Sequence, residues 1–192
     1  MGNSGVFDVN DIRHLMDYQQ WSSVGTLELI TTQSDVSVSS VIFTDIKEAE
    51  YNVHLLTIND YQGASNDWLG LRFYESGTEE GTSVYDKALQ YGYYSGSFGE
   101  NKASNTNYLF TGVESTTSSN ITGNGFTYIY NAGNKTKYTF TTHHGVNSAG
   151  QYMAFGGGVL PQLSIVDGIK IKGGAASSTV TGDFSLYGIR YS

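Results

Sequence analysis

The 192-residue chain contains no cysteine and a single proline, and only 15% of its residues are charged. Without cysteine, a disulfide framework and a cysteine-ligated zinc site are both excluded. No stretch of the sequence approaches the roughly 18 consecutive apolar residues of a transmembrane helix. The N-terminal stretch lacks the basic head and apolar core of a secretory signal. We therefore expect neither a membrane span nor a secretory signal.

Basic residues are also scarce. Lys and Arg total 10 against 18 Asp and Glu, so the net charge is −8. The basic residues are scattered, and Lys170 with Lys172 is the nearest approach to a basic stripe. Nucleic-acid-binding proteins neutralise phosphates with clustered Lys and Arg. We therefore expect no direct contact with DNA or RNA.

Glycine, serine, threonine and tyrosine are abundant instead, with 24 Gly and 15 Tyr in the chain. Aromatic residues make up 14% of the sequence, which argues against disorder. This composition favours strands and tight turns over helices. From residue 24 onward, about ten or eleven short alternating runs are separated by Gly, Asn, Ser and Asp turns. The pattern predicts an all-β protein, with one antiparallel β-sandwich or jelly-roll domain over residues 24–192.

The expected strands include an alternating run from Tyr51 to Thr57. The other clear runs are Trp68–Tyr74, Tyr85–Tyr94, Tyr108–Thr111, Phe126–Asn131, Thr136–Thr142, Gln151–Phe155, Leu163–Lys172 and Val180–Tyr191. Turns are expected at Asn59-Asp60 and at Gly123-Asn124-Gly125, because these residue types tolerate a left-handed backbone or form Asx turns.

Residues 1–23 depart from this pattern and form a separate N-terminal segment. Its apolar residues fall on one face of a predicted short α-helix, with Asp8 placed to cap the helix. A helix this short is marginal in water unless its apolar face docks on something. That surface is either the chain's own sheet or a partner. As an anchor on a partner, the docking face would consist of Phe7, Ile12, Leu15, Met16 and Trp21.

Catalytic motifs are missing from the sequence. There is no Gly-x-Ser-x-Gly elbow, and Gly156-Gly157-Gly158 lacks the Lys and the Ser or Thr of a phosphate loop. His143 and His144 are adjacent, so on a strand they face opposite sides and cannot chelate one metal. We expect no enzyme activity, no cofactor and no metal site.

The densest acidic cluster is a hairpin that could supply ligands for a cation, as could the turns at Asn59-Asp60 and Asn66-Asp67. Glu75, Glu79 and Glu80 lie within six residues of one another. Calcium takes six to eight oxygen ligands, some of which such a turn could supply. The simpler interpretation is a solvated turn whose charges keep a sheet edge soluble.

The tyrosines are the residues that most suggest a binding surface. Tyr91, Tyr93 and Tyr94 cluster in the sequence, and Trp68 is a further candidate for the same aromatic surface. Rings with a polar tip suit protein interfaces and sugar faces. The plainer alternative is that these rings pack on a pleated sheet, as the β propensity of tyrosine predicts. The sequence leaves packing, a protein interface and a glycan contact open.

Several segments, taken in order, carry a family resemblance. They are GTLELITTQ (25–33), SSVIFTDI (39–46), EYNVHLLTIND (50–60), LGLRFYESG (69–77), IVDGIK (165–170) and TGDFSLYGIRY (181–191). Together they resemble small virion structural proteins of tailed bacteriophages, marine and cyanobacterial phages in particular. The opening GVFDVNDIRHLMDYQQW (5–21) looks like the short N-terminal module of many phage fibre and decoration proteins.

This resemblance implies a non-enzymatic β-sandwich on the virion exterior, assembled in the host cytoplasm. It implies a capsid-decoration, head-fibre or collar protein that contacts other phage structural proteins and forms a homo-oligomer, with a trimer expected. Two alternatives are a tail-fibre or receptor-binding module for a host surface glycan, and a free carbohydrate-binding domain. Which virion element it binds, its copy number and any glycan recognition stay open.

Overall fold

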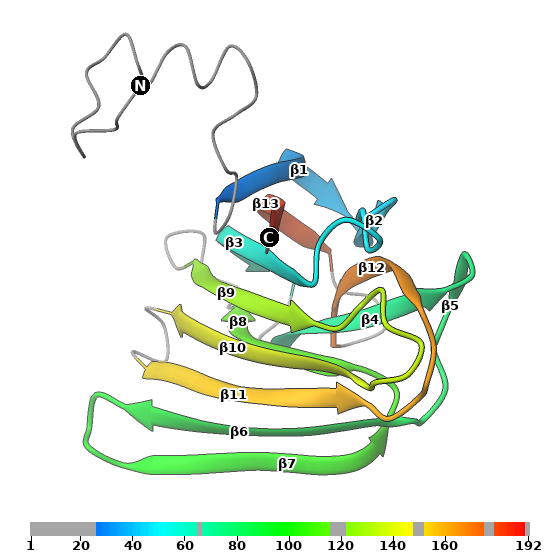
Figure 1. The fold of residues 1–192 in the computed structure, drawn as a ribbon. Coiled ribbons are helices and arrows are strands. Elements are labelled where there is room, and N and C mark those ends of the chain that lie inside the picture. Colours follow the sequence, from blue (N-terminus) through cyan, green and yellow to red (C-terminus); the bar gives the residue numbers. More distant parts are fainter. Residues whose placement is uncertain (1–25, 65–66, 116–121, 148–151, 175–178, 191–192) are drawn as a thin grey trace, which may run out of the picture.

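The computed structural model describes residues 26–64, 67–115, 122–147, 152–174 and 179–190 (Figure 1). Within these ranges the regular structure is entirely β-strand, which confirms the predicted all-β class. No helix in the described ranges has the length and hydrophobicity needed to cross a bilayer. The predicted N-terminal helix, with its docking residues Phe7 to Trp21, lies outside the described residues.

Eight strands form the larger of two sheets, which runs from β1 at one edge to β7 at the other (Figure 1). Every neighbouring pair in this sheet is antiparallel. In spatial order the strands are β1 (Leu27–Val38), β13 (Val180–Ile189), β3 (Val53–Gly63), β9 (Gly123–Tyr130), β10 (Thr139–Asn147), β11 (Tyr152–Leu160), β6 (Tyr85–Tyr93) and β7 (Phe98–Thr106).

The smaller sheet is also antiparallel and packs against one face of the larger one. Its strands in order are β2 (Ser40–Thr44), β12 (Val166–Gly173), β4 (Asp67–Glu75) and β5 (Thr78–Glu79), while β8 (Leu109–Ser115) also pairs with β4. The result is a sandwich-like arrangement of two antiparallel sheets.

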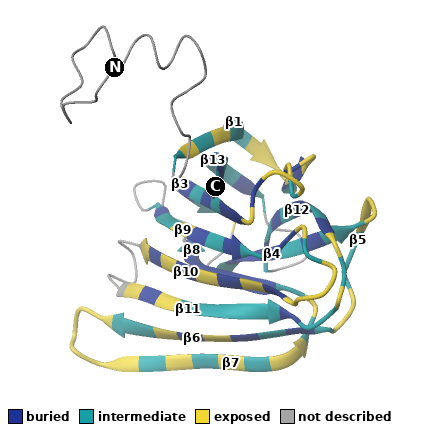
Figure 2. Ribbon diagram, in the orientation of Figure 1, coloured by how far each residue is buried: buried dark blue, intermediate teal, exposed yellow. Residues whose placement is uncertain are grey.

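Burial alternates along the strands of the large sheet, as Figure 2 shows for β10. In β10, Thr141 and His143 are buried between the sheets, whereas Phe140 and His144 are exposed on the opposite face. The period of two follows from the pleat, which sends successive side chains to opposite faces. It confirms that His143 and His144 face opposite sides.

The main core lies between the sheets and is built from aliphatic and aromatic side chains of both. Its largest fully buried members are Tyr61, Tyr85, Phe73, Phe184, Ile46, Leu56, Leu69, Leu71, Leu109, Ile129, Leu160 and Ile169. Burying one such aliphatic side chain contributes about 1.5–3 kcal/mol. The chain therefore has enough apolar surface for a rigid two-layer domain without disulfides.

Glycines let β8 approach the inner face of the large sheet closely. A Cβ on Gly145 of β10 would lie 2.0 Å from the carbonyl oxygen of Gly112, which itself has a φ of +77°. A Cβ on Gly125 would likewise lie 2.6 Å from a methyl group of Val113 in β8. The turn predicted at Gly123-Asn124-Gly125 is therefore wrong, because these glycines belong to β9 and admit β8 rather than reverse the chain.

Other local predictions also differ from the structure. The turn predicted at Asn59-Asp60 is wrong, because both residues lie inside β3 at an irregularity where Asp60 has a φ of +57°. The polar edge strand β7 was not predicted, since its sequence FGENKASNT has no apolar alternation. Strand β11 extends through Gly156-Gly157-Gly158, beyond the run predicted to end at Phe155.

Candidate interaction surface

Three neighbouring strands at the centre of the large sheet, β9, β10 and β11, contain no Asp, Glu, Lys or Arg. Their registers place side chains of like character beside one another. His144 lies opposite Phe126 on one side and Phe155 on the other, and Val146 lies opposite Met153. Directly opposite residues share a face of the sheet. The solvent-facing side of these strands is therefore an uncharged, largely apolar surface.

We call this surface the outer apolar face and define it by five side chains. They are between 39% and 53% exposed, and they are Phe126, Phe140, Val146, Met153 and Phe155. Aromatic contacts organise it, since the Phe126 ring meets those of Tyr128 and His144 edge-on, with ring centres 5.7 and 5.9 Å apart. A cluster of large apolar side chains on a solvent-facing sheet is typical of interaction sites.

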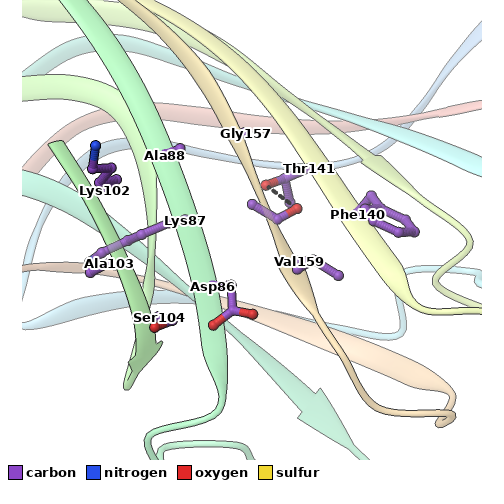
Figure 3. A pocket seen from close by; sticks show the side chains of 11 residues that line it. Asp86, Lys87, Ala88, Lys102, Ala103, Ser104, Phe140, Thr141, Gly157 and Val159 are labelled. Carbon is purple, nitrogen blue, oxygen red and sulfur yellow. Dashed lines mark hydrogen bonds between the residues drawn. The ribbon is translucent and has the colours of Figure 1, made fainter. Parts of the chain in front are cut away.

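A shallow hollow of about 670 Å³ adjoins this face across β10, β11, β6 and β7 (Figure 3). Its floor has almost no side-chain cover, because Gly157 of β11 pairs with Ala88 of β6. Phe140 and Val159 line it together with these residues. A neighbouring depression is lined by Ala88 and by Phe155, which extends the hollow along β11.

Charged and polar groups line the β6–β7 side of the hollow (Figure 3). One carboxylate oxygen of Asp86 accepts a hydrogen bond from the backbone N–H of Asn105 at 3.0 Å. The Lys102 Nζ pairs with a carboxylate oxygen of Glu100 at 2.7 Å. The hollow therefore has an apolar side toward β10 and β11 and a charged rim toward the sheet edge.

Lys87 projects from β6 to the opposite, interior side of the sheet and is buried. Its Nζ lies 3.6 Å from the centre of the Tyr108 ring and 3.7 Å from that of Phe110. Burial lowers the pKa of Lys87 to about 8. Two aromatic faces stabilise the ammonium group by cation–π attraction, which offsets part of the cost of its burial.

The structure brings three of the four predicted aromatic residues together. The Tyr91 ring lies 6.1 Å from Trp68 and 5.6 Å from Tyr93, measured between ring centres. Trp68 and Tyr91 are only partly exposed and pack against a second small core that includes Phe110. Tyr94 lies in the turn between β6 and β7 and is 78% exposed. Of the set, Tyr93 and Tyr94 present the most surface to solvent.

The carboxylates of the acidic hairpin are bound by other groups of the same chain. Glu79 accepts hydrogen bonds from Arg72 and from Lys170, both at 2.6 Å. Burial alone would raise the pKa of Glu79, but the bonds from Lys170 and Arg72 outweigh it and hold that pKa below its ordinary value. Glu80 accepts from the backbone N–H of Thr82 at 2.8 Å.

Glu75, the third acid of the hairpin, accepts a hydrogen bond from the hydroxyl of Ser164. Across the ranges that the structure describes, no group of three or more His, Asp or Glu side chains is placed to hold a metal ion. The contacts of this hairpin fit a structural ion-pair network that fastens β5 to β4 and β12.

The burial of His143 and His54 was not predicted from the sequence. Neither ring nitrogen of His143 has a hydrogen-bond partner among the described residues, although the side chain is 4% exposed. Burial lowers the pKa of His143 to about 4, and the neighbouring His144 adds to the effect. His54, by contrast, has its Nε2 2.8 Å from the carbonyl oxygen of Ile46.

The residues that form the outer apolar face and the hollow were not predicted from the sequence. The expected runs at Phe126–Asn131, Thr136–Thr142 and Gln151–Phe155 contain all of its members except Val146. The signal was the scarcity of charge in these runs, where Lys137 is the single charged residue, but only the pairing of β9, β10 and β11 shows that they form one surface.

Comparisons with known proteins give little further information. No protein-family model matches this chain, and no curated protein matches it. Among solved structures, it has a weak likeness to a fructofuranosidase from Schwanniomyces occidentalis complexed with fructosylnystose, with 5% identity and a TM-score of 0.25. That alignment covers 86% of this chain and 34% of the other. A likeness at this level bears on neither fold nor function.

Proposed function

We propose that this chain is a non-enzymatic structural protein on the exterior of a tailed-phage virion. Residues 1–23 attach it to a capsid or collar protein, and the jelly-roll form of the sandwich packs against neighbouring subunits, with a homotrimer as the expected assembly. The observation that carries the proposal is the outer apolar face, an uncharged surface on three adjacent strands of a rigid sheet. Such a surface suits permanent packing against protein.

Three further features support the proposal. The first four strands alternate between the sheets, with β1 and β3 in the large sheet and β2 and β4 in the small one, which supports the jelly-roll form. The order of the segments from GTLELITTQ to TGDFSLYGIRY supports the phage assignment by resemblance. The acidic net charge of −8 also suits a protein that must not compete for the packaged genome.

The attachment can be tested with full-length variants of equal charge. Leu15→Asp with Met16→Asp adds two negative charges to the predicted docking face, and Asn10→Asp with His14→Asp adds two to the opposite face of the predicted helix. We expect the first variant to lose occupancy on virions that lack the protein, and the second to bind like the wild type. Equal occupancy of both variants would contradict the proposed role of the docking face.

A host-glycan function is the second candidate, and the exposed rings of Tyr93 and Tyr94 at the β6–β7 turn favour it. Aromatic rings stack on the apolar faces of sugars. Saturable binding of host surface polysaccharide by the wild type, abolished in Tyr93→Ala or Tyr94→Ala but retained in Tyr138→Ala, would support this candidate. Tyr138 is the matched control because it is similarly exposed, at 42%, outside that turn.

A further inference from the structure

The outer apolar face stands out because the rest of the molecule is acidic. The chain carries a net charge of −8, yet β9, β10 and β11 contribute no charged side chain. Two surfaces of like charge repel at short range, whereas a basic partner would be attracted to the acidic remainder of the surface. An uncharged face is thus the part of this molecule where a second, equally acidic copy can approach without meeting like charge.

The same face carries both a projecting ring and a hollow. Phe155 is 47% exposed on β11, and Gly157 stands two residues further along the same strand and on the same side. Positions two apart on a strand are separated by roughly 7 Å. Gly157 pairs with Ala88 of β6, so the floor beside Phe155 offers little more than one methyl group. A ring and a hollow at this spacing can be filled reciprocally by two copies of one surface.

We propose that the outer apolar face binds a second copy of this chain, with Phe155 of one copy seated in the hollow over Gly157 and Ala88 of the other. The two large sheets then face each other at about 10 Å, the ordinary spacing of packed sheets. Phe140 and Val159, which line the hollow, surround the incoming ring. The charged rim at Asp86 and Lys102 stays at the border of the contact. The contact requires neither the phage role nor the N-terminal attachment.

The first test measures the mass of the full chain in solution by sedimentation equilibrium and light scattering over a wide concentration range. Because the contact is reciprocal, it joins chains two by two, so we expect the wild type to be a dimer, or a hexamer if a trimer also forms through another surface. Phe155→Glu, and separately Ala88→Lys, should weaken association about thirtyfold or more, as loss of a central interface residue does. Leu163→Glu is the matched control, because Leu163 is 63% exposed in the loop after β11 and off this face.

A mixing experiment separates loss of the contact from loss of the fold. If Phe155 of one copy lies over Ala88 of another, the Phe155→Glu and Ala88→Lys variants should associate with each other more tightly than either does with itself. Recovery on mixing requires that both variants are folded and that the two positions meet. A monomeric wild type at all concentrations, equal weakening by Leu163→Glu, or no recovery on mixing would overturn the proposal.

Discussion

The ammonium nitrogen of Lys87 lies 3.6 Å from the centre of the Tyr108 ring, inside the sandwich. Lys87 comes from the large sheet, and Tyr108 directly precedes β8, which pairs with the small sheet. In the described part of the chain this lysine forms no ion pair with a carboxylate. Its charge is held by the two rings of Tyr108 and Phe110, so one cation bridges the two layers.

Replacing Lys87 by methionine should stabilise the protein at neutral pH. Burial lowers the folded-state pKa to about 8, so the folded protein binds fewer protons than the unfolded chain between that value and the ordinary 10.5. The free energy of unfolding of the wild type should therefore increase as pH rises through this window. We expect Lys87→Met to raise the free energy of unfolding by about 1–3 kcal/mol at pH 7. In this variant the unfolding free energy should no longer increase between about pH 8 and 10. Urea unfolding at several pH values measures both effects.

Lys102→Met is the control, because Lys102 is exposed on the neighbouring strand β7 and pairs with Glu100. Its unfolding free energy should follow that of the wild type at every pH. Measurements should stop at pH 10, since burial raises the pKa of Tyr61 to about 12 and stability from that group is lost as pH rises from 10. A Lys87→Met variant that keeps the wild-type rise would contradict the assignment.

His143 should make the fold sensitive to mild acid. Burial lowers its folded-state pKa to about 4, against 6.5 for the exposed ring. The unfolded chain therefore binds more protons in this window, and stability falls as pH drops from 6.5 toward 4. The loss assigned to this residue is on the order of 3 kcal/mol. In His143→Leu, urea unfolding at pH 7 and pH 4.5 should show a smaller loss than in the wild type.

The adjacent residue supplies the matched control. His144→Leu changes a side chain on the exposed face of the same strand and should leave most of the acid dependence in place, because burial of His143 is the larger cause of its lowered pKa. His143→Leu should also be at least as stable as the wild type at pH 7, because it removes two ring nitrogens that have no partner among the described residues. Parallel acid dependence in the two variants would refute the role of His143.

The hydroxyl of Tyr85 links the two sheets and should be worth a measurable amount of stability. It accepts a hydrogen bond from the Phe73 N–H at 3.0 Å and donates one to the Glu80 carbonyl at 2.8 Å. Tyr85→Phe leaves both backbone groups without this partner, so we expect chemical denaturation to show a loss of about 1–3 kcal/mol. Tyr130→Phe removes an exposed hydroxyl near Thr142 and should cost much less.

Glu79 should contribute stability that depends on its ionised form. Its pKa is held below the ordinary value, so the contribution is present above about pH 4.5 and is lost as pH falls through the lower folded-state pKa. Glu79→Gln should cost about 1–3 kcal/mol at pH 7 and reduce the acid-induced loss. Glu100→Gln, which breaks an exposed pair, should change the unfolding free energy little. Equal effects of the two substitutions in thermal unfolding would count against the network.

The all-β class and most strand positions could be predicted because alternation is a local property. Strand β4 was predicted to within a residue at each end, and β6 likewise. The predictions failed where the local signal is weak or ambiguous. Strand β7 is polar because it lies at an edge, and Gly123 and Gly125 resemble turn residues although they make room for β8. Such close approaches depend on partners far away in the sequence.

The candidate surface was harder to predict than the fold. The clustered Tyr91, Tyr93 and Tyr94 attracted attention because they are neighbours in sequence, yet the pleat turns Tyr91 inward toward Trp68. Phe126, Phe140 and Phe155 form one face only because three strands pair in a particular register. Register is a long-range property, which a single sequence does not reveal.

The position of β13 constrains the order in which the molecule can be completed. This strand lies between β1 and β3, so β1 joins the large sheet only through a partner synthesised more than 140 residues later. Pairings of such long range form slowly. Until β13 has left the ribosome, β1 therefore lacks the strand that joins it to the large sheet. The backbone N–H and C=O groups of β1 thus stay exposed as an unpaired strand for most of synthesis, which is the state in which a strand edge is most prone to aggregate.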